Sequence, residues 1–554
     1  MPNTLSSLRS GGHSNRVIHR IRHRLPGRQV AAGSPRKVRE ETTARKNTTA
    51  RLSVGVHYEP SGVDPHVNAA ELGLQMTMGV FDTLVYKTME GDYLPHLAKS
   101  FEISPDETLY RFRLRRDVKF HDGTPFDAAA CKFSLDRAVD PANRSQLAGS
   151  MLGPYQSSRV VDEHTLEIRL CAPYALLLDS LSQGWLAPVS PTAVKRFGSD
   201  FRRNPVGTGP FRFEEWRPGE RITLRRNPEY AWAPPVVENR GAPYLDEISF
   251  LFLANDGQRT AALEEGRVSA VFYVPPADIG RLAADPAYRV GTWPIRGIPV
   301  CMMMNIARPP TDELAVRQAI NFAMDRDALV QEVFRGHFPR AFGPLSQFTL
   351  GYEPSVEQLY PYDVEQARRL LQEAGWAEAG DDGVRLKAGR RLELDFYALP
   401  VNYYPEFGRI VQRQLLQAGI KVNVRQLAPP EWIQAGRRGD HHLIPQGKYA
   451  SSPHFLSYVY HSRHSHDGYG WSKRSAEHRP GFDALLERGE RTLQKDEYLS
   501  IYRQVQRTVM EEALIAPLHC NTNIIATRAG ITGLRFDAIG AYPLFHDTSI
   551  AESR

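Results

Sequence analysis

Residues 392–424 have the sequence LELDFYALPVNYYPEFGRIVQRQLLQAGIKVNV, and this stretch determines the fold class. Apolar residues alternate with polar ones over 392–396, the period of two that predicts a β-strand. A helical pattern follows over 407–415 and ends at Gly419, after which alternation resumes over 420–424. A strand, a helix and a second strand joined by a short glycine exit form a βαβ unit. We therefore predict an α/β sheet with parallel strand pairs in the second half of the chain.

Capping residues predict two further helices earlier in this half. Asp312 is a suitable N-cap for one helix that continues to Val330. Asp363, with Gln366 three residues later, resembles a capping box at the start of the second helix. Gly375 stands where that helix needs a residue in the left-handed conformation at its end. The apolar residues of both helices recur on one face, which we expect to be buried.

The first half is rich in predicted strands. Residues 52–56, 110–114 and 166–170 each show apolar residues at every second position. Residues 211–213 and 222–224 are expected to pair as a hairpin across the Arg-Pro-Gly-Glu turn that lies between them.

Composition excludes several classes of protein. The chain has 554 residues, enough for two or three domains, and 42% hydrophobic and 24% charged residues exclude a disordered, collagenous or coiled-coil chain. No apolar run approaches the roughly 18 residues of a membrane span, so an integral membrane protein is not expected. The four cysteines are too scattered for a disulfide scaffold, and we expect most of them to be buried thiols: Cys131, Cys171, Cys301 and Cys520.

The positive charge belongs to the N-terminal tail. Residues 1–51 carry twelve Lys or Arg and two Glu, a net charge of +10 within the overall +6, which leaves −4 for the rest. We expect this basic tail to be disordered and the acidic body not to bind nucleic acid. Residues 17–21 are the best candidate for the apolar part of an export signal, but His19 and Arg20 interrupt them. A start codon placed too far upstream is the favoured explanation, ahead of a nucleic-acid-binding arm and an inert extension.

No motif for enzyme chemistry is present. The chain has no Walker A loop, no GxSxG elbow and no HExxH helix. His461, His464 and His466 could ligate a divalent metal, but their Ser- and Gly-rich surroundings favour a solvated loop. His519 and Cys520 are interpreted as a buried structural pair. We therefore predict no catalytic residue, no metal and no cofactor.

A series of segments carries a resemblance to a known family. From about Leu52 to the C-terminus the chain resembles the family 5 extracellular solute-binding proteins, receptors of ABC importers for oligopeptides, dipeptides, nickel and related solutes. The segments that match, in chain order, are residues 80–85, 93–98, 108–126, 204–213, 226–230, 316–321, 325–326 and 373–376.

The resemblance implies an α/β, two-lobed periplasmic binding protein fold of type II, with an extra domain in the first lobe and hinge closure. Strands near Gly291 and over 521–526 would cross between the lobes. The implied domains are 1–51 as a tail, 52–84 plus 201–290 plus 525–554 as the first lobe, 85–200 as its inserted domain, and 291–524 as the second lobe.

The resemblance also implies the function. We expect the periplasmic substrate-binding component of an ABC importer, which is a monomer, captures a small solute between its lobes and delivers it to membrane permease subunits. Peptide is the expected solute, and a nickel complex or an oligosaccharide is the alternative. An enzyme such as a hydrolase on the same scaffold ranks second. A DNA-binding regulator ranks third, because residues 1–51 show no helix-turn-helix pattern.

The expected solute contacts lie late in the second lobe. Peptide-binding members have an Asp there that grips the ligand's ammonium, whereas the matching tract here, residues 446–456, has no acidic residue. A buried ammonium without a counter-charge would cost several kcal/mol, so Lys448, if inward, would favour an anionic or neutral group. A plain βα loop, with a carboxylate from elsewhere as anchor, is the alternative. The residues expected to bind substrate are Tyr449, Ser451, Ser452, Tyr403, Tyr404 and, from the first lobe, His66.

Overall fold

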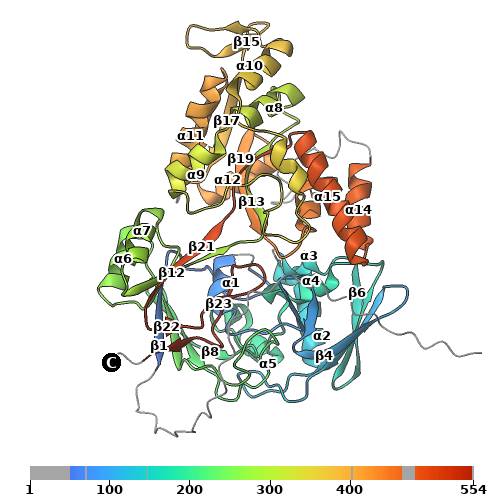
Figure 1. The fold of residues 1–554 in the computed structure, drawn as a ribbon. Helices are drawn as coiled ribbons and strands as arrows, with labels where there is room; N and C mark the ends of the chain where they lie inside the picture. Colours follow the sequence, from blue (N-terminus) through green and yellow to red (C-terminus); the bar gives the residue numbers. More distant parts are fainter. Residues whose placement is uncertain (1–49, 69–70, 146, 401–402, 465–480, 552–554) are drawn as a thin grey trace, which may run out of the picture. The chain divides into compact units, whose positions relative to one another are not determined.

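Two β-sheets organise the computed structural model, which describes residues 50–68, 71–145, 147–400, 403–464 and 481–551 (Figure 1). The first sheet has seven strands in the order β12-β21-β11-β1-β10-β9-β8. Its strands are β1 (Arg51–Val56), β8 (Phe211–Arg217), β9 (Arg221–Arg226), β10 (Glu247–Phe252), β11 (Ala270–Phe272), β12 (Tyr288–Pro294) and β21 (Thr522–Arg528).

Strand β1 lies at the centre of this sheet, as its apolar alternation suggests. It runs parallel to β10 on one side and to β11 on the other. Leu52, Val54 and Val56 are buried in the core beneath the sheet. The hairpin predicted on either side of residues 217–220 is confirmed, because β8 and β9 pair in antiparallel register.

The second sheet has five strands in the order β18-β17-β19-β13-β20. They are β13 (Gly297–Met304), β17 (Glu393–Ala398), β18 (Lys421–Gln426), β19 (Leu443–Tyr449) and β20 (Ile515–His519). The predicted βαβ unit is confirmed: β17 and β18 are parallel, helix α11 (Tyr404–Gln417) joins them, and Gly419 has φ +83° at the exit.

Both faces of this sheet are covered, which explains why every residue of β13 is buried. Val300, Met302 and Met304 pack against one set of helices, while Cys301 and Met303 pack against another. The first set is α8 (Leu314–Ala323), α9 (Arg326–Phe334), α10 (Val364–Glu373) and α11; the second includes α12 (Pro429–Arg438), α13 (Phe455–Tyr460), α14 (Phe482–Arg491) and α15 (Lys495–Glu511).

The single helix predicted from Asp312 to Val330 is wrong in two respects. The chain forms two helices, because Met324 is extended and Asp325 caps the second by accepting from Ala328 N at 2.9 Å. The first helix has Glu313 as its N-cap instead of Asp312, and Glu313 makes no capping hydrogen bond.

The capping signals of α10 are confirmed. Asp363 accepts a hydrogen bond from Gln366 N at 2.8 Å, and Gly375 has φ +89° beyond the end of the helix.

A four-stranded antiparallel sheet, β4-β5-β7-β6, has a core of its own. Its strands β5 (Leu109–Leu114) and β7 (Thr165–Leu170) confirm two predicted strands, and β4 (Ala98–Ile103) and β6 (Tyr155–Asp162) flank them. Helices α2 (Ala128–Val139) and α4 (Leu177–Leu181) contribute to the same core. The ends of the inserted domain, placed at residues 85 and 200, stay a prediction.

The chain passes between the two large sheets twice. Strand β12 of the seven-stranded sheet leads through Ile295 and Arg296 into β13 of the five-stranded sheet, and β20 returns through Cys520 and Asn521 into β21 (Figure 1). The pairs β12–β21 and β13–β20 are both antiparallel, so the two connections run side by side.

The remaining elements are short. They are α1 (Glu71–Thr77), α3 (Ala148–Met151), α5 (Pro191–Phe197), α6 (Asp256–Glu264), α7 (Pro276–Ala284), β2 (Val85–Lys87), β3 (Tyr93–Pro95), β14 (Glu378–Ala379), β15 (Arg385–Lys387), β16 (Arg390–Arg391), β22 (Ile531–Thr532), β23 (Arg535–Phe536), β24 (Pro543–Leu544) and β25 (Ser549–Ile550). Over the described ranges, none of the helices has the length and apolar character needed to cross a bilayer.

Candidate functional site

A cavity of about 450 Å³, here called the aromatic cavity, is lined by residues from both large sheets and from the connections between them. Its size is typical of a small-molecule site. The lining residues are His57, Tyr58, Tyr273, Ile295, Val300, Phe338, Leu399, Tyr403, Tyr404, Gly447, Tyr449, Asn521 and Thr522.

Strand direction explains why these residues meet. His57 and Tyr58 directly follow β1, and Tyr273 directly follows β11, the strand parallel to it. In the other sheet, Tyr403 lies beyond the end of β17, and Tyr449 ends β19, which is parallel to β17. The carboxyl ends of parallel strands are where α/β sheets bind ligands, and here two such edges contribute to one cavity.

The cavity wall is held in place by ring contacts. The Tyr403 ring lies 4.9 Å from both Phe334 and Tyr404 and 5.2 Å from His519, measured between centroids. The His57 ring meets Tyr273 edge-on at 4.4 Å. Tyr273 has φ +58°, a left-handed conformation that is costly for a bulky residue and that is found more often at functional sites than elsewhere.

Burial favours the neutral forms of His57, Tyr403 and Tyr404 in the cavity. Burial, with help from Arg259, lowers the pKa of His57 to about 4. Burial raises the pKa of Tyr403 and Tyr404. Within the described part of the chain, the lining contains no Asp, Glu, Lys or Arg.

Of the residues predicted to bind substrate, Tyr403, Tyr404 and Tyr449 come together in this cavity. Lys448 is not among its lining residues, because alternate positions along β19 face opposite sides of the sheet, and Gly447 and Tyr449 occupy the positions on the cavity side. Ser452 lines a separate cavity of about 420 Å³, and its Oγ lies 2.5 Å from His454 Nδ1.

His66 lies outside the aromatic cavity, in a buried network with Asp64 and Arg137. Arg137 Nη1 donates to His66 Nδ1 at 3.0 Å, and His66 Nε2 lies 2.9 Å from the carbonyl of Ala187. Asp64 accepts from both the Arg137 guanidinium and His66 N. Both ring nitrogens of His66 are therefore used within the protein, and His66 is not among the lining residues of the aromatic cavity.

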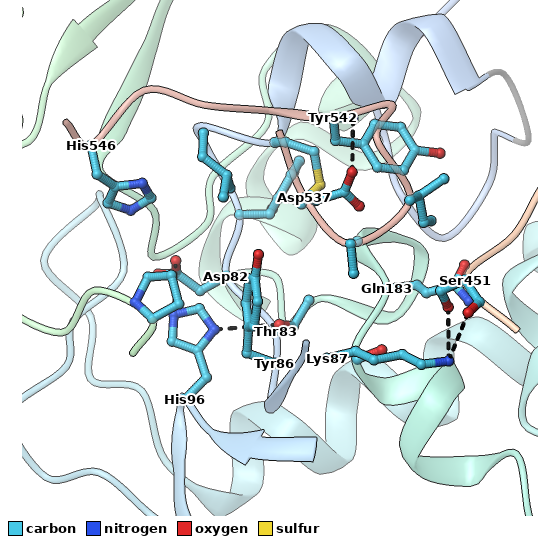
Figure 2. A pocket seen from close by; sticks show the side chains of 18 residues that line it. Asp82, Thr83, Tyr86, Lys87, His96, Gln183, Ser451, Asp537, Tyr542 and His546 are labelled. Atoms are coloured by element: carbon cyan, nitrogen blue, oxygen red, sulfur yellow. Dashed lines mark hydrogen bonds and ion pairs between the residues drawn. The ribbon is translucent and has the colours of Figure 1, made fainter. Parts of the chain in front are cut away.

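Ser451 lies in a buried cluster around Asp179. Ser451 Oγ donates to Asp179 Oδ1 at 2.9 Å, and Gln183 Nε2 donates to Oδ2 at 3.1 Å. Lys87 Nζ forms an ion pair with Asp179. It also donates to Ser451 O at 3.3 Å (Figure 2). This cluster joins α4 and β2 to the tract after β19.

The same cluster fixes the charge of Asp179. Burial alone would raise the pKa of this carboxyl, but the charges of Lys87 and His454 and the hydrogen bonds from Lys87 and Ser451 lower it to about 2. A carboxylate from another part of the chain, that of Asp179, therefore lies beside residues 446–456. Lys87 already neutralises it, and its role as an anchor for the solute stays a prediction.

A pocket of about 50 Å³ extends along Lys87 and is lined by Ser451 and Gln183 as well as by Asp82 and His96 (Figure 2). Its Asp82 accepts from Tyr230 Oη at 3.0 Å and from Trp232 Nε1 at 2.9 Å, and His96 Nε2 is 3.4 Å away. Over the described ranges, no three His, Cys, Asp or Glu side chains are placed to hold a metal ion. Asp82 is thus held by hydrogen bonds from Tyr230 and Trp232.

Of the three histidines for which a solvated loop was favoured, His461 is buried, so that expectation is wrong for this residue. His461 lies 3.6 Å from Asp483 and 3.4 Å from Glu487, the His464 ring stacks on Tyr458 at 4.7 Å, and His466 falls outside the described residues. His519 and Cys520 are both buried, as the sequence predicted.

The sequence pattern alone did not single out His57, Tyr58, Tyr273, Asn521 or Thr522 as site residues. Their signal is positional: each lies at or just beyond the end of a strand, and Asn521 and Thr522 also lie at a connection between the two sheets. That signal can be used only once the strand order is known, because residues 57, 273 and 522 are far apart in the chain.

Comparison with known proteins gives a consistent result. Residues 92–470 match the family described as bacterial extracellular solute-binding proteins, family 5 Middle. A probable di/tripeptide-binding protein 5 of Pseudomonas aeruginosa (strain UCBPP-PA14) is 28% identical over 532 residues, which are 90% of this chain and 95% of that protein. The glutathione-binding protein GsiB of Escherichia coli O1:K1 / APEC is 32% identical over 283 residues, 50% of this chain and 52% of that protein.

A solved structure confirms the predicted fold class. NikA from Brucella suis in complex with Fe(III)-EDTA superposes with a TM-score of 0.80, at 24% identity, over 90% of this chain and 100% of that one. The chain belongs to the bacterial extracellular solute-binding proteins of family 5.

Proposed function

We propose that this protein is the substrate-binding component of an ABC importer in the periplasm, and that it captures a peptide-type solute in the aromatic cavity. The observation that carries the proposal is the lining of this cavity, which combines the carboxyl ends of parallel strands from two sheets with residues of both connections. A solute held there touches both sheets at once.

Closure follows from that geometry. A solute that contacts both lobes binds the closed form better than the open one, and it shifts the equilibrium by the difference. The two connections, at residues 295–296 and 520–521, are the segments about which the lobes would move. The closed form would then be recognised by the permease subunits.

Peptide is the proposed solute class for two reasons. The similar proteins from Pseudomonas aeruginosa and Escherichia coli are named for di- or tripeptides and for glutathione. The cavity also offers aromatic faces for side chains and neutral polar groups for amides: His57, Asn521 and Thr522. Tyr403, Tyr404 and Tyr449 are the proposed contacts in the second lobe, and Ser451 supports the closed form through Asp179.

A receptor fits this cavity better than a hydrolase. Hydrolysis is most efficient with a general base whose pKa lies near the operating pH. In the described lining, the pKa of His57 is held at about 4 and those of Tyr403 and Tyr404 are raised, so none of these groups suits that task.

Isothermal titration calorimetry of the full chain against dipeptides, tripeptides, glutathione, a nickel–histidine complex and an oligosaccharide tests the proposal. We expect micromolar or tighter binding of at least one peptide, with a smaller radius of gyration in solution scattering on binding. Release of amino acids during the titration would favour the hydrolase. Binding of the oligosaccharide or nickel complex alone would contradict the peptide assignment.

A further inference from the structure

The aromatic cavity has polar groups but no charged ones among its described lining residues. Its polar side chains are His57, Asn521, Thr522 and the tyrosine hydroxyls. Since the pKa of His57 is lowered to about 4, this ring is neutral at physiological pH. An ionised part of a solute would therefore find no opposite charge on this wall.

Because the cavity is buried, its lack of charge disfavours the entry of an ionised group. An ammonium or carboxylate moved from water into a site without a counter-charge costs several kcal/mol. Asp179, the buried carboxylate beside residues that continue the Tyr449 strand, already pairs with Lys87 and accepts from Ser451 and Gln183. Little of its capacity remains for the charge of a solute.

Two polar atoms of the lining residues lack partners within the described part of the chain. His57 Nδ1 and Thr522 Oγ1 are buried and make no hydrogen bond there. Unsatisfied buried groups are costly and rare in native proteins. His57 follows the carboxyl end of β1 and Thr522 begins β21, so one solute could satisfy groups from two elements.

We propose that the part of the solute that enters the aromatic cavity is uncharged: an amide, hydroxyl or aromatic group that hydrogen-bonds to His57 and Thr522 and packs against the tyrosines. A free α-ammonium or α-carboxylate of the solute stays outside this cavity. The inference rests on the proposed function and specifies its solute class as internal or blocked peptide groups.

Four forms of one tripeptide test this inference: Ala-Tyr-Ala free, N-acetylated, C-amidated and blocked at both ends. We expect the doubly blocked form to bind at least as tightly as the free one. Weakening by about tenfold or more on acetylation, equivalent to about 1.4 kcal/mol, would overturn the inference while leaving the peptide receptor intact. Absence of binding by all four forms would count against both proposals.

Glycine betaine is a necessary further probe. An aromatic cavity can also hold a quaternary ammonium through cation–π contacts. Binding of glycine betaine in preference to the blocked tripeptide would overturn the inference, because the aromatic faces would then serve a cation.

Two threonines offer a matched pair of variants. Thr522 and Thr548 both have buried hydroxyls without partners in the described structure, but only Thr522 lines the aromatic cavity. We expect Thr522→Val to weaken binding of the doubly blocked tripeptide by about three- to tenfold, the value of one hydrogen bond. Thr548→Val should leave it unchanged. Equal effects of the two variants, at unchanged melting temperature, would contradict a contact at Thr522.

A charge can also be added to the cavity without changing its shape. Asn521→Asp puts a carboxylate on the lining in place of an amide of the same size. We expect this variant to prefer the free tripeptide over the acetylated one by about tenfold, a preference not expected of the wild type, since an ammonium then gains a counter-charge. An unchanged ratio of the two affinities would contradict the inference that the missing charge keeps the ammonium out of this cavity.

Discussion

Ser451 Oγ donates a hydrogen bond of 2.9 Å to Asp179 Oδ1, and this bond joins the tract after β19 to helix α4. The two residues are far apart in sequence and belong to different cores. Lys87 neutralises Asp179 and donates to Ser451 as well, so three buried side chains connect β2 and α4 to the tract after β19.

Removing the charge of Asp179 should be strongly destabilising. Asp179→Asn leaves the buried Lys87 ammonium without a counter-charge, and the expected loss in free energy of unfolding is about 3–5 kcal/mol. Urea unfolding measures it. Asp92→Asn is the matched control, because Asp92 pairs with Lys495 on the surface, where such pairs contribute about 0–1 kcal/mol. The double change Asp179→Leu with Lys87→Met should cost less than Asp179→Asn; a larger cost would contradict the role of the unpaired ammonium.

Ser451→Ala should change the rate of solute release more than it changes folding. The variant removes the hydroxyl that joins the tract after β19 to Asp179, and in the proposed closure this bond forms only when the lobes come together. We expect solute dissociation, followed by stopped-flow tyrosine fluorescence, to become about three- to tenfold faster. Ser462→Ala is the control: Ser462 also donates to a carboxylate, Asp483, but both lie within the second lobe. If the two variants release solute equally fast, the Ser451 bond does not govern closure.

The exposed cysteine should react with thiol reagents much faster than the three buried cysteines. All four are free thiols; Cys171 is exposed, while Cys131, Cys301 and Cys520 are buried. Burial raises the pKa of these three, that of Cys520 to about 11, so their thiolate forms are scarce. Titration with an aromatic disulfide reagent should detect one fast thiol in the native protein, lost in Cys171→Ser, and four after denaturation without reductant. Fewer than four would indicate a disulfide.

The sequence predicted what depends on local pattern. The βαβ unit around residues 392–424 and the cap at Asp363 follow from alternation and hydrogen bonding between near neighbours, and both are present. The break at Met324 was missed because the apolar face continues across it, while the Asp325 side chain competes for the backbone of the next turn.

Only the residues that the second half of the chain contributes to the aromatic cavity could be predicted from the sequence. Tyr403, Tyr404 and Tyr449 belong to a single half of the chain, where strand ends could be placed from the pattern. Their partners His57, Tyr273 and Thr522 depend on strand order, which nonlocal packing decides. For the same reason His66, which follows a predicted strand too, could not be distinguished from His57: its ring turns toward Arg137 and Ala187.

Asp537 should make the protein less stable as the pH rises from about 4 to about 6. Burial raises the pKa of this carboxyl from 3.8 to about 6, against the effect of backbone N–H groups that include those of Tyr542, Ala541 and Gly540. Because the folded state then binds the proton more tightly than the unfolded one, stability is lost as pH rises through this window. The loss is less than the full ~3 kcal/mol because the side chain is only half-buried.

All three of these N–H groups donate to Oδ1, at 3.1–3.2 Å, so Asp537→Asn keeps the acceptor and cannot ionise. We expect the difference in melting temperature between Asp537→Asn and wild type to grow in favour of the variant between pH 4 and pH 6, and the buried histidines, which titrate alike in both proteins, to cancel from it. Asp200→Asn, at an exposed position, should show no such trend, and a constant difference for Asp537→Asn would mean that this carboxyl titrates as it does in the unfolded chain.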